Sequence, residues 1–297
     1  MDENNAPDKF TIFHIDGGVG KNILATAVIR SYKNQHPDRK IVVTTSWPEA
    51  WFNNPDVFRF YPHGNNAWFH DLYVKGKDVH IVRHEPYFDH DYILRRRHLV
   101  EVWCKLAGIP YDGSNPAVYV NPLEIELMKL KVNKTRPILL MQTSGGGEGQ
   151  RYPFSWYRDL PLGYAQKVAD HFRDTHDIVH LGRKDQPLVQ GATRPELGLR
   201  EAMVLFAFSD KRLLIDSFGQ HLCAAFQLPS TVVWIGNDPG VLGYAIHKNI
   251  RAQGTPVYNT YHSSYLEDFS IGGEPLQYPY NTLELFDINE LIRSLEG

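Results

Sequence analysis

The sequence predicts a protein of the α/β class, in which two doubly wound Rossmann-like domains face each other across a cleft. Three observations support this prediction. Strand and helix patterns alternate in both halves of the chain, a glycine-rich turn follows the first strand of each half, and a polar segment separates the halves. The chain of 297 residues is long enough for two domains of about 150 residues each.

The first half begins as a βαβ unit. An apolar strand at Phe10–Ile15 runs into a glycine-rich turn at 16–20, and apolar residues then recur at helical spacing from Ile23 to Tyr32. The pattern continues with strands at Lys40–Thr44, Val57–Tyr61 and Val79–Arg83, and with helices at Tyr92–Leu106 and Leu123–Leu130.

Asn133–Pro137 is the predicted linker, because polar residues and a proline stand directly before a new apolar strand. It divides the chain into domains at 1–132 and 133–297. In the second domain we expect strands at Ile138–Gln142, Ile178–Leu181, Arg212–Ile215 and Thr231–Ile235, and helices at Leu162–Asp174, Leu199–Phe208 and directly after Asp216. The closing helix, Ile288–Leu295, is a candidate to pack back on the first domain.

The composition is that of an ordinary globular protein, with 42% hydrophobic and 22% charged residues. A net charge of −3 argues against a broadly basic surface that binds nucleic acid. The two cysteines, Cys104 and Cys223, indicate neither a metal motif nor a disulfide framework. The polar N-terminus is unlike a secretory signal, and no apolar run approaches the roughly 18–20 residues of a membrane span. We therefore expect a cytoplasmic protein, either a monomer or a homodimer.

The most informative segment is Leu213–Phe226, LLIDSFGQHLCAAF. An apolar strand ends at Asp216, and a helix begins within the next three residues. Free backbone N–H groups and the positive end of the helix dipole converge at such a junction and favour an anion, typically a phosphate. Ser217 adds a hydroxyl, Gly219 permits close backbone approach, and His221 lies one turn into the helix. An ordinary helix cap is the alternative interpretation.

The glycine-rich turn of the first half is not a Walker A motif. Ile15 stands at the first glycine position, and Asn22 replaces the Ser or Thr that binds magnesium. We interpret the turn as one in which Gly17, Gly18 and Gly20 let a substrate approach the N-terminus of the following helix.

Two segments of the second half are candidates for the remaining ligand contacts. The glycine-rich stretch from Ser144 to Arg151 offers a cradle and a cation for a diphosphate, although an ordinary loop explains it equally well. Gly182, Arg183 and Asp185 follow the next strand and are suited to hold a ribose or a base, with a solvated turn as the simpler interpretation.

Several segments of the chain, taken together, resemble the heptosyltransferase-like enzymes of glycosyltransferase family 9, which have the two-domain GT-B fold. The similar segments are the opening IDGGVGKNILATAVIRSYKNQHPDRKIVV, Asn53–Val57, Leu181–Asp185, Leu199–Ala202, Asp216–Phe226, and the strand after Pro229 that ends in Ile235–Pro239. The resemblance covers most of the chain, and Asp216–Phe226 is its specific part.

The resemblance implies transfer of a sugar, with inversion, from a nucleotide-diphosphate donor such as ADP-heptose. The donor would bind the C-terminal domain and the acceptor the N-terminal domain. No metal or other cofactor is expected, because a helix N-terminus with Arg151 and His221 would stabilise the leaving diphosphate. The resemblance assigns the diphosphate to Asp216, Ser217, Gly219, Gln220, His221 and Arg151, and the nucleoside to Gly182, Arg183 and Asp185.

Lys21 departs from the family pattern, which has an acidic residue, the presumed general base, directly after the last glycine of the first turn. An ammonium group cannot accept a proton unless its pKa is strongly lowered. We therefore expect Asp16 to be the base, with Asp89 and Asp91 as rivals and Lys21 as a contact for an anionic ligand. Loss of transferase activity, leaving a module that only binds a nucleotide sugar, is the alternative.

The acceptor is expected to be a glycan or a lipid-linked saccharide of the lipopolysaccharide type. A basic run, Arg95–His98, falls on the predicted helix Tyr92–Leu106, where it is either a solvated face or a contact for acceptor phosphates. A hydroxylated DNA base is the alternative acceptor, as in viral glycosyltransferases of this fold.

Overall fold

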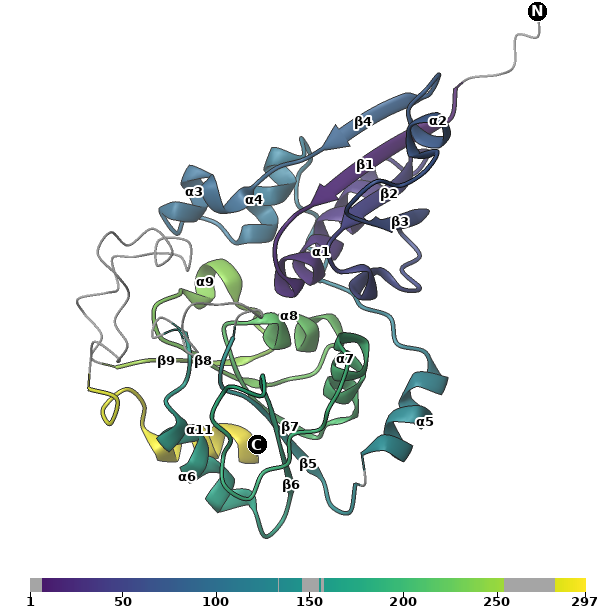
Figure 1. Ribbon diagram of the computed structural model, residues 1–297. Helices are drawn as coiled ribbons and strands as arrows, with labels where there is room; N and C mark the ends of the chain where they lie inside the picture. The colour runs from purple at the N-terminus through teal and green to yellow at the C-terminus, as the bar shows by residue number, and fades with distance from the viewer. Residues whose placement is uncertain (1–6, 133, 146–154, 156–157, 254–280) are drawn as a thin grey trace, which may run out of the picture.

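The structure is a computed structural model, and it describes residues 7–132, 134–145, 155, 158–253 and 281–297. Two parallel sheets form the two halves of the molecule, with the first half above the second in Figure 1. The two-sheet α/β architecture predicted from the sequence is therefore confirmed.

The first sheet has the strand order β3-β2-β1-β4, formed by β1 (Lys9–Ile15), β2 (Lys40–Thr45), β3 (Arg59–Pro62) and β4 (Asp78–Val82). Ile12 lies opposite Val42 on one side and Ile81 on the other. The long helix α1 (Val19–Gln35) packs on one face, and α2 (Phe69–Tyr73) contributes Tyr73 to a small apolar cluster on the other. Short helical turns, η1 (Pro48–Trp51) and η2 (Pro86–Phe88), lie in the connections.

The second sheet has the order β6-β5-β7-β8-β9, formed by β5 (Ile138–Gln142), β6 (Asp177–Leu181), β7 (Lys211–Ile215), β8 (Thr231–Trp234) and β9 (Lys248–Arg251). Its central strands, β5, β7 and β8, are buried on both faces, as in parallel sheets generally. Leu139 packs with the cluster under α6 (Leu162–Phe172) and α11 (Ile288–Glu296), whereas Leu140 packs with the cluster under α7 (Leu199–Phe208) and α8 (Phe218–Ala225).

Two helices at the domain boundaries pack on the second half. The last helix, α11, contacts α6, β7 and β8, so it does not return to the first half. The helix α5 (Pro122–Lys131), which precedes the predicted linker, lies beside α7 (Figure 1). The boundary between residues 132 and 133 stays a prediction.

The predicted helix Tyr92–Leu106 is wrong in one respect, because the structure has two helices there. They are α3 (His90–Ile93) and α4 (Leu99–Leu106). Arg95 has a φ of 54°, in the left-handed region that ends a helix. The basic run therefore forms a turn instead of a helical face.

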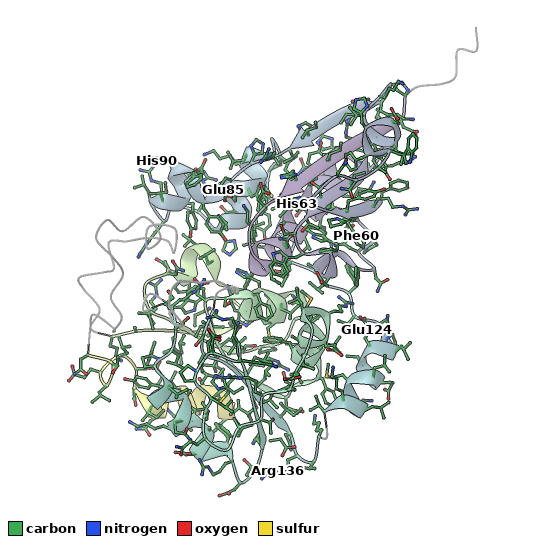
Figure 2. The ribbon with its side chains drawn as sticks, viewed as in Figure 1. Phe60, His63, Glu85, His90, Glu124 and Arg136 are labelled. Atoms are coloured by element: carbon green, nitrogen blue, oxygen red, sulfur yellow. The ribbon has the colours of Figure 1, made fainter. Side chains whose placement is uncertain are left out.

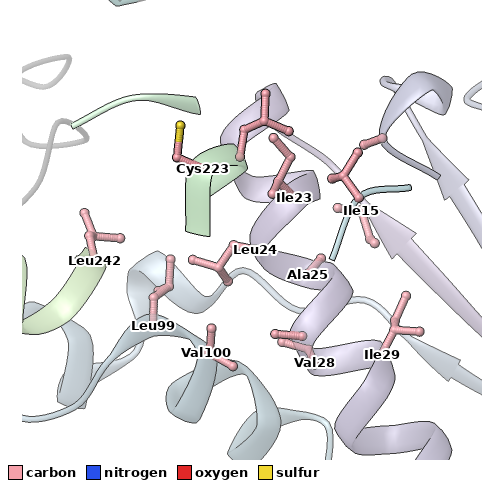
Figure 3. Packing of buried hydrophobic residues seen from close by; sticks show 14 of the residues in the cluster. Ile15, Ile23, Leu24, Ala25, Val28, Ile29, Leu99, Val100, Cys223 and Leu242 are labelled. Atoms are coloured by element: carbon pink, nitrogen blue, oxygen red, sulfur yellow. The ribbon is translucent and has the colours of Figure 1, made fainter. Parts of the chain in front are cut away.

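The halves share one apolar core, which positions the site between them. Figure 3 shows α1 packed beside α4 and α8, with Leu24 and Leu99 near Cys223 and Leu242, the last of these from α9 (Pro239–Leu242). Both cysteines are buried and free, as expected. In the described residues, none of the helices has the length and apolar character needed to cross a membrane.

Candidate functional site

Each sheet has one point where its strand order reverses, and both points are turned toward the middle of the molecule. In the first sheet this point lies between β1 and β4, and in the second it lies between β5 and β7. Parallel α/β sheets bind ligands outside the carboxyl ends of the strands at such points. The predicted site residues Asp16 and Asp216 directly follow β1 and β7.

The N-terminus of α8 is available to an anion. Ser217 is its N-cap residue and is extended, and no side chain of the described residues caps the first turn. The backbone N–H groups of that turn therefore keep their capacity to bind a ligand. The Nε2 group of Gln142, from the end of β5, donates to the Ser217 hydroxyl at 3.2 Å. Two strand ends and a helix N-terminus thus meet at one place.

Gly219 and Gln220 lie inside the fold. A Cβ atom on Gly219 would lie 2.4 Å from Oε1 of Gln142 and 2.8 Å from the ring of Phe206, so the glycine is required by packing. Gln220 is fully buried and donates from Nε2 to the carbonyl of Leu242 at 2.9 Å. Both residues therefore position the motif. Oε1 of Gln220 has no hydrogen-bond partner among the described residues, and its contact with a ligand stays a prediction.

Asp216 is also buried, and its carboxylate accepts a hydrogen bond from the Asn237 side chain. Burial raises the pKa of Asp216, and the nearby charge of Arg158 acts in the opposite direction. Asp216 therefore joins the end of β7, where α8 begins, to the segment that follows β8. Its role of closing the loop stays a prediction.

His221 is buried between the halves, where its Nδ1 atom lies 2.8 Å from the Tyr244 hydroxyl. Burial, followed by the charges of His98 and His247, lowers the pKa of His221 to about 3. The imidazole is neutral at physiological pH, so it can meet a diphosphate as a hydrogen-bonding group and not as a cation. Its contact with the diphosphate stays a prediction.

Arg158 is a cation near the start of α8 that the sequence analysis did not name. Its Nε atom is buried and has no hydrogen-bond partner in the described part of the chain. The guanidinium packs against Gly145, directly after β5, and its charge reaches both Asp159 and Asp216. Arg151, the predicted cation, lies outside the described residues. The sequence offered one indication of Arg158, because it lies only seven positions after Arg151.

The end of β6 is organised largely by its own contacts. Arg183 pairs with Asp185 at 3.0 Å, and the main-chain N–H of Arg183 donates to Oε1 of Gln186 at 2.8 Å. A Cβ on Gly182 would lie 3.0 Å from that same oxygen. Ser144, at the end of β5, is half-buried. These residues lie at neighbouring strand ends, as predicted, and their contact with a nucleoside stays a prediction.

The turn of the first half packs directly against the motif helix. Gly17 has a φ of +96°, and its carbonyl accepts a hydrogen bond from Trp47 Nε1 at 2.8 Å. Gly18 is the N-cap residue of α1. A Cβ on Gly20 would lie 3.0 Å from the His221 ring, so Gly20 permits close approach of α1 and α8. Both helix N-termini therefore face the same region.

Lys21 is engaged by neighbouring side chains in this structure. Its Nζ atom lies 2.5 Å from Oε2 of Glu85, its side chain is 5% exposed, and the ammonium lies over the rings of Tyr87 and Trp103. Lys21 therefore forms a partly buried ion pair beneath the turn, with the Glu85 side chain 27% exposed. Its contact with an anionic ligand stays a prediction.

Asp16 lies at the carboxyl edge of the first sheet with half of its side chain exposed. Its Oδ1 atom is 3.0 Å from His14 Nε2 and 3.3 Å from His63 Nε2, and Arg83 lies 3.6 Å from Oδ2. Figure 2 shows His63 on the side of the first half that is turned toward the second. Asp16 is thus an accessible carboxylate at the predicted acceptor side.

The rival carboxylates are engaged elsewhere. Asp89 caps α3 by accepting from the N–H of Asp91 at 2.8 Å, and Lys105 pairs with both. In the basic run, Arg95 donates to the carbonyl of Gly236 at 3.3 Å and His98 to that of Gly243 at 3.0 Å. Part of the run therefore ties the first half to the second instead of forming a solvated face.

Buried ionisable groups make the stability of the protein pH-dependent. Burial lowers the pKa of His180 to about 4 and that of His221 to about 3, from 6.5. The unfolded chain therefore binds protons first as the pH falls below 6.5, and stability is lost. Burial raises the pKa of Asp159 to about 6, which has the opposite effect between pH 3.8 and 6. The destabilising effect of the two histidines exceeds the stabilising effect of the aspartate. The free energy of unfolding therefore decreases as the pH is lowered.

The fold is that of solved glycosyltransferases. A glycosyltransferase of family 9 from Veillonella parvula matches with a TM-score of 0.66 and 13% identity, over 97% of this chain and 96% of that one. The ADP-heptose lipopolysaccharide heptosyltransferase II of E. coli matches at 0.63 and 15%, over 85% and 93%. TibC, an iron-containing dodecameric glycosyltransferase of enterotoxigenic E. coli, matches at 0.61 and 13%, over 85% and 65%. No protein-family model and no curated protein matches the sequence. The predicted GT-B fold is confirmed.

Proposed function

We propose that the protein is a glycosyltransferase of the family 9 type, which moves a sugar from a nucleotide-diphosphate donor to a hydroxyl of a glycan or lipopolysaccharide-type acceptor, with inversion. The observation that carries the proposal is the N-terminus of α8, which no side chain of the described residues caps and which lies near the half-buried Arg158. Among the similar structures, the Veillonella parvula protein is named as a family 9 glycosyltransferase and the E. coli protein as an ADP-heptose heptosyltransferase. ADP-heptose is therefore the first donor to test.

The leaving diphosphate acquires negative charge as the bond to the sugar breaks. Backbone N–H groups at the start of α8, the Ser217 hydroxyl and the Arg158 guanidinium would stabilise that charge, with Arg151 as a further cation. A fixed array of this kind needs no reorganisation during the reaction and no divalent cation between the phosphates. We therefore propose that donor binding is independent of magnesium.

The acceptor hydroxyl must lose a proton as it attacks the anomeric carbon from the face opposite the nucleotide. Asp16 is our proposed base, because it is accessible at the carboxyl edge of the first sheet, whereas Asp89 and Asp91 are paired with Lys105. Each transfer would then pass one proton from the acceptor to Asp16 and release a nucleoside diphosphate.

The experiment measures the thermal unfolding of the protein with a panel of nucleoside diphosphates and their sugars. A ligand at 100 times its Kd stabilises the folded state by about 2.7 kcal/mol. Loss of a charge-assisted hydrogen bond costs about 1.5–3 kcal/mol, so Arg158→Ala should lower affinity at least about tenfold. Arg136→Ala is the matched control, because Arg136 precedes β5 at the opposite edge and pairs with Asp177 (Figure 2). Equal binding by both variants would remove Arg158 from the site.

A module that binds a nucleotide sugar without transferring it is the second candidate. The observation that favours it is Lys21, which stands where the family has its base and is buried in an ion pair with Glu85. Asp16→Asn separates the two functions. An enzyme loses turnover of the donor and keeps donor binding in this variant, whereas a binding module shows no turnover in the wild type either.

A further inference from the structure

We propose that His14, Asp16 and His63 form a binding site for a divalent transition-metal ion such as Zn²⁺, Co²⁺ or Fe²⁺. Two imidazoles and one carboxylate are a common protein ligand set for these ions. The set is assembled by tertiary structure, because His14 and Asp16 belong to the end of β1 and His63 follows β3. Their ligand atoms all lie within 4.8 Å of one another.

The separations between these atoms fit a common ion. Ligands about 2.1 Å from one metal lie about 3.0 Å apart in octahedral geometry and about 3.4 Å apart in tetrahedral geometry. The Asp16 Oδ1 atom is 3.0 Å from His14 Nε2 and 3.3 Å from His63 Nε2. Both nitrogen atoms therefore already lie at ligand spacing from the same oxygen. His63 Nε2 also lies 3.1 Å from the Ile15 carbonyl, and binding of an ion would replace that contact.

The surroundings orient the set. The other ring nitrogen of His14, Nδ1, lies 2.8 Å from the Thr44 hydroxyl, and such an outer hydrogen bond is the usual support of a metal-binding histidine. Arg83 lies near Oδ2 of Asp16, the carboxylate oxygen that does not face the imidazoles. Solvent screens the charge of Arg83, because its side chain is 70% exposed. Oδ1 is left to face the two imidazoles.

The half-exposed position of Asp16 leaves room for water or a substrate hydroxyl in the remaining coordination positions. Mg²⁺ prefers oxygen ligands, so the site should discriminate against it. One consequence rests on the proposed function: a carboxylate that coordinates an ion is a weaker base, so bound Zn²⁺ should slow sugar transfer. Metal binding itself is independent of that function.

The test is calorimetric titration of the metal-stripped full-length protein with Zn²⁺, repeated with Mg²⁺, and with Co²⁺ followed by its visible absorption. We expect one Zn²⁺ per chain at this site and no Mg²⁺ binding there. His14→Ala and His63→Ala should each weaken Zn²⁺ binding at least about 100-fold, and Thr44→Val by about 10–100-fold. His70→Ala is the matched control, because His70 lies 3.7 Å from Asp71 in an exposed pair on α2.

Wild-type affinity in the double variant His14→Ala/His63→Ala, or no Zn²⁺ binding by the wild type, would overturn the proposal. Asp16→Asn keeps the shape of the side chain and removes its charge, so it tests the site even where an alanine variant folds poorly. These measurements need no sugar donor. Their failure therefore leaves the glycosyltransferase proposal standing, and an inactive protein that binds Zn²⁺ leaves the metal site standing.

Discussion

Replacement of Gly219 by alanine tests whether the glycine of the motif is required by packing or only by a ligand. The new Cβ would lie 2.4 Å from Oε1 of Gln142 and between 2.8 and 2.9 Å from two ring atoms of Phe206. Phe206 belongs to α7 and is fully buried in the shared core, where close packing opposes movement of the ring. The clash must therefore shift the helix or the strand.

The magnitude follows from two opposing effects. Overpacking of a core costs about 1–3 kcal/mol, and the fully buried ring argues for about 3 kcal/mol here. Alanine in place of glycine within a helix contributes about 1 kcal/mol in the stabilising direction. We expect Gly219→Ala to lose about 2 kcal/mol of unfolding free energy.

Gly163, in α6, is the matched control, because in the described part of the chain no atom lies within 4 Å of the Cβ that an alanine would place there. Gly163→Ala should gain up to about 1 kcal/mol from helix propensity alone. The assay is urea unfolding of both variants without nucleotide, followed by circular dichroism. The two alanine variants should differ by about 3 kcal/mol. If Gly219→Ala is as stable as Gly163→Ala and loses only nucleotide binding, the packing argument is refuted and the glycine serves the ligand.

Three further predictions concern buried charges. Glu85→Ala should lose about 3 kcal/mol of unfolding free energy in urea, because it leaves the Lys21 ammonium buried without its partner. The double variant Lys21→Met/Glu85→Gln removes both charges and should recover this stability, and no recovery would contradict the ion-pair argument. Arg200→Ala should lose about 2 kcal/mol, because Arg200 pairs with Glu124 at 2.6 Å and donates to the carbonyl of Glu49 across the two halves; a variant as stable as the wild type would show that this contact is dispensable. The unfolding free energy should fall by about 1.4 kcal/mol for each unit that the pH is lowered from 6 to 4. In this range unfolding lets His180 and His221 each bind a proton and makes Asp159 release one, so the net uptake is one proton. Equal urea midpoints at pH 4.5 and pH 7 would contradict this.

Elements with strong local signals were predicted accurately. The strand Ile138–Gln142 and the helix Leu199–Phe208 have the predicted bounds, because an apolar run and a helical repeat are properties of a few neighbouring residues. The short strand Lys248–Arg251 was not predicted, since its residues are mostly polar and it is defined by pairing with β8. The turn at Arg95 was missed for a similar reason: the basic run contains neither glycine nor proline, and its contacts with the second half define it.

The sequence by itself therefore determined the alternation of strands and helices, the GT-B architecture that this alternation builds, and the anion-favouring junction at Asp216–Ser217. The tertiary structure decided what each polar residue does there. Lys21 pairs with Glu85, 64 positions away, and Arg158 packs against Gly145 at the end of β5. Asp16 meets His63, which directly follows another strand, β3. The physical reason is that burial and charge pairing arise between segments that are distant in the chain, whereas residue patterns report only on neighbours.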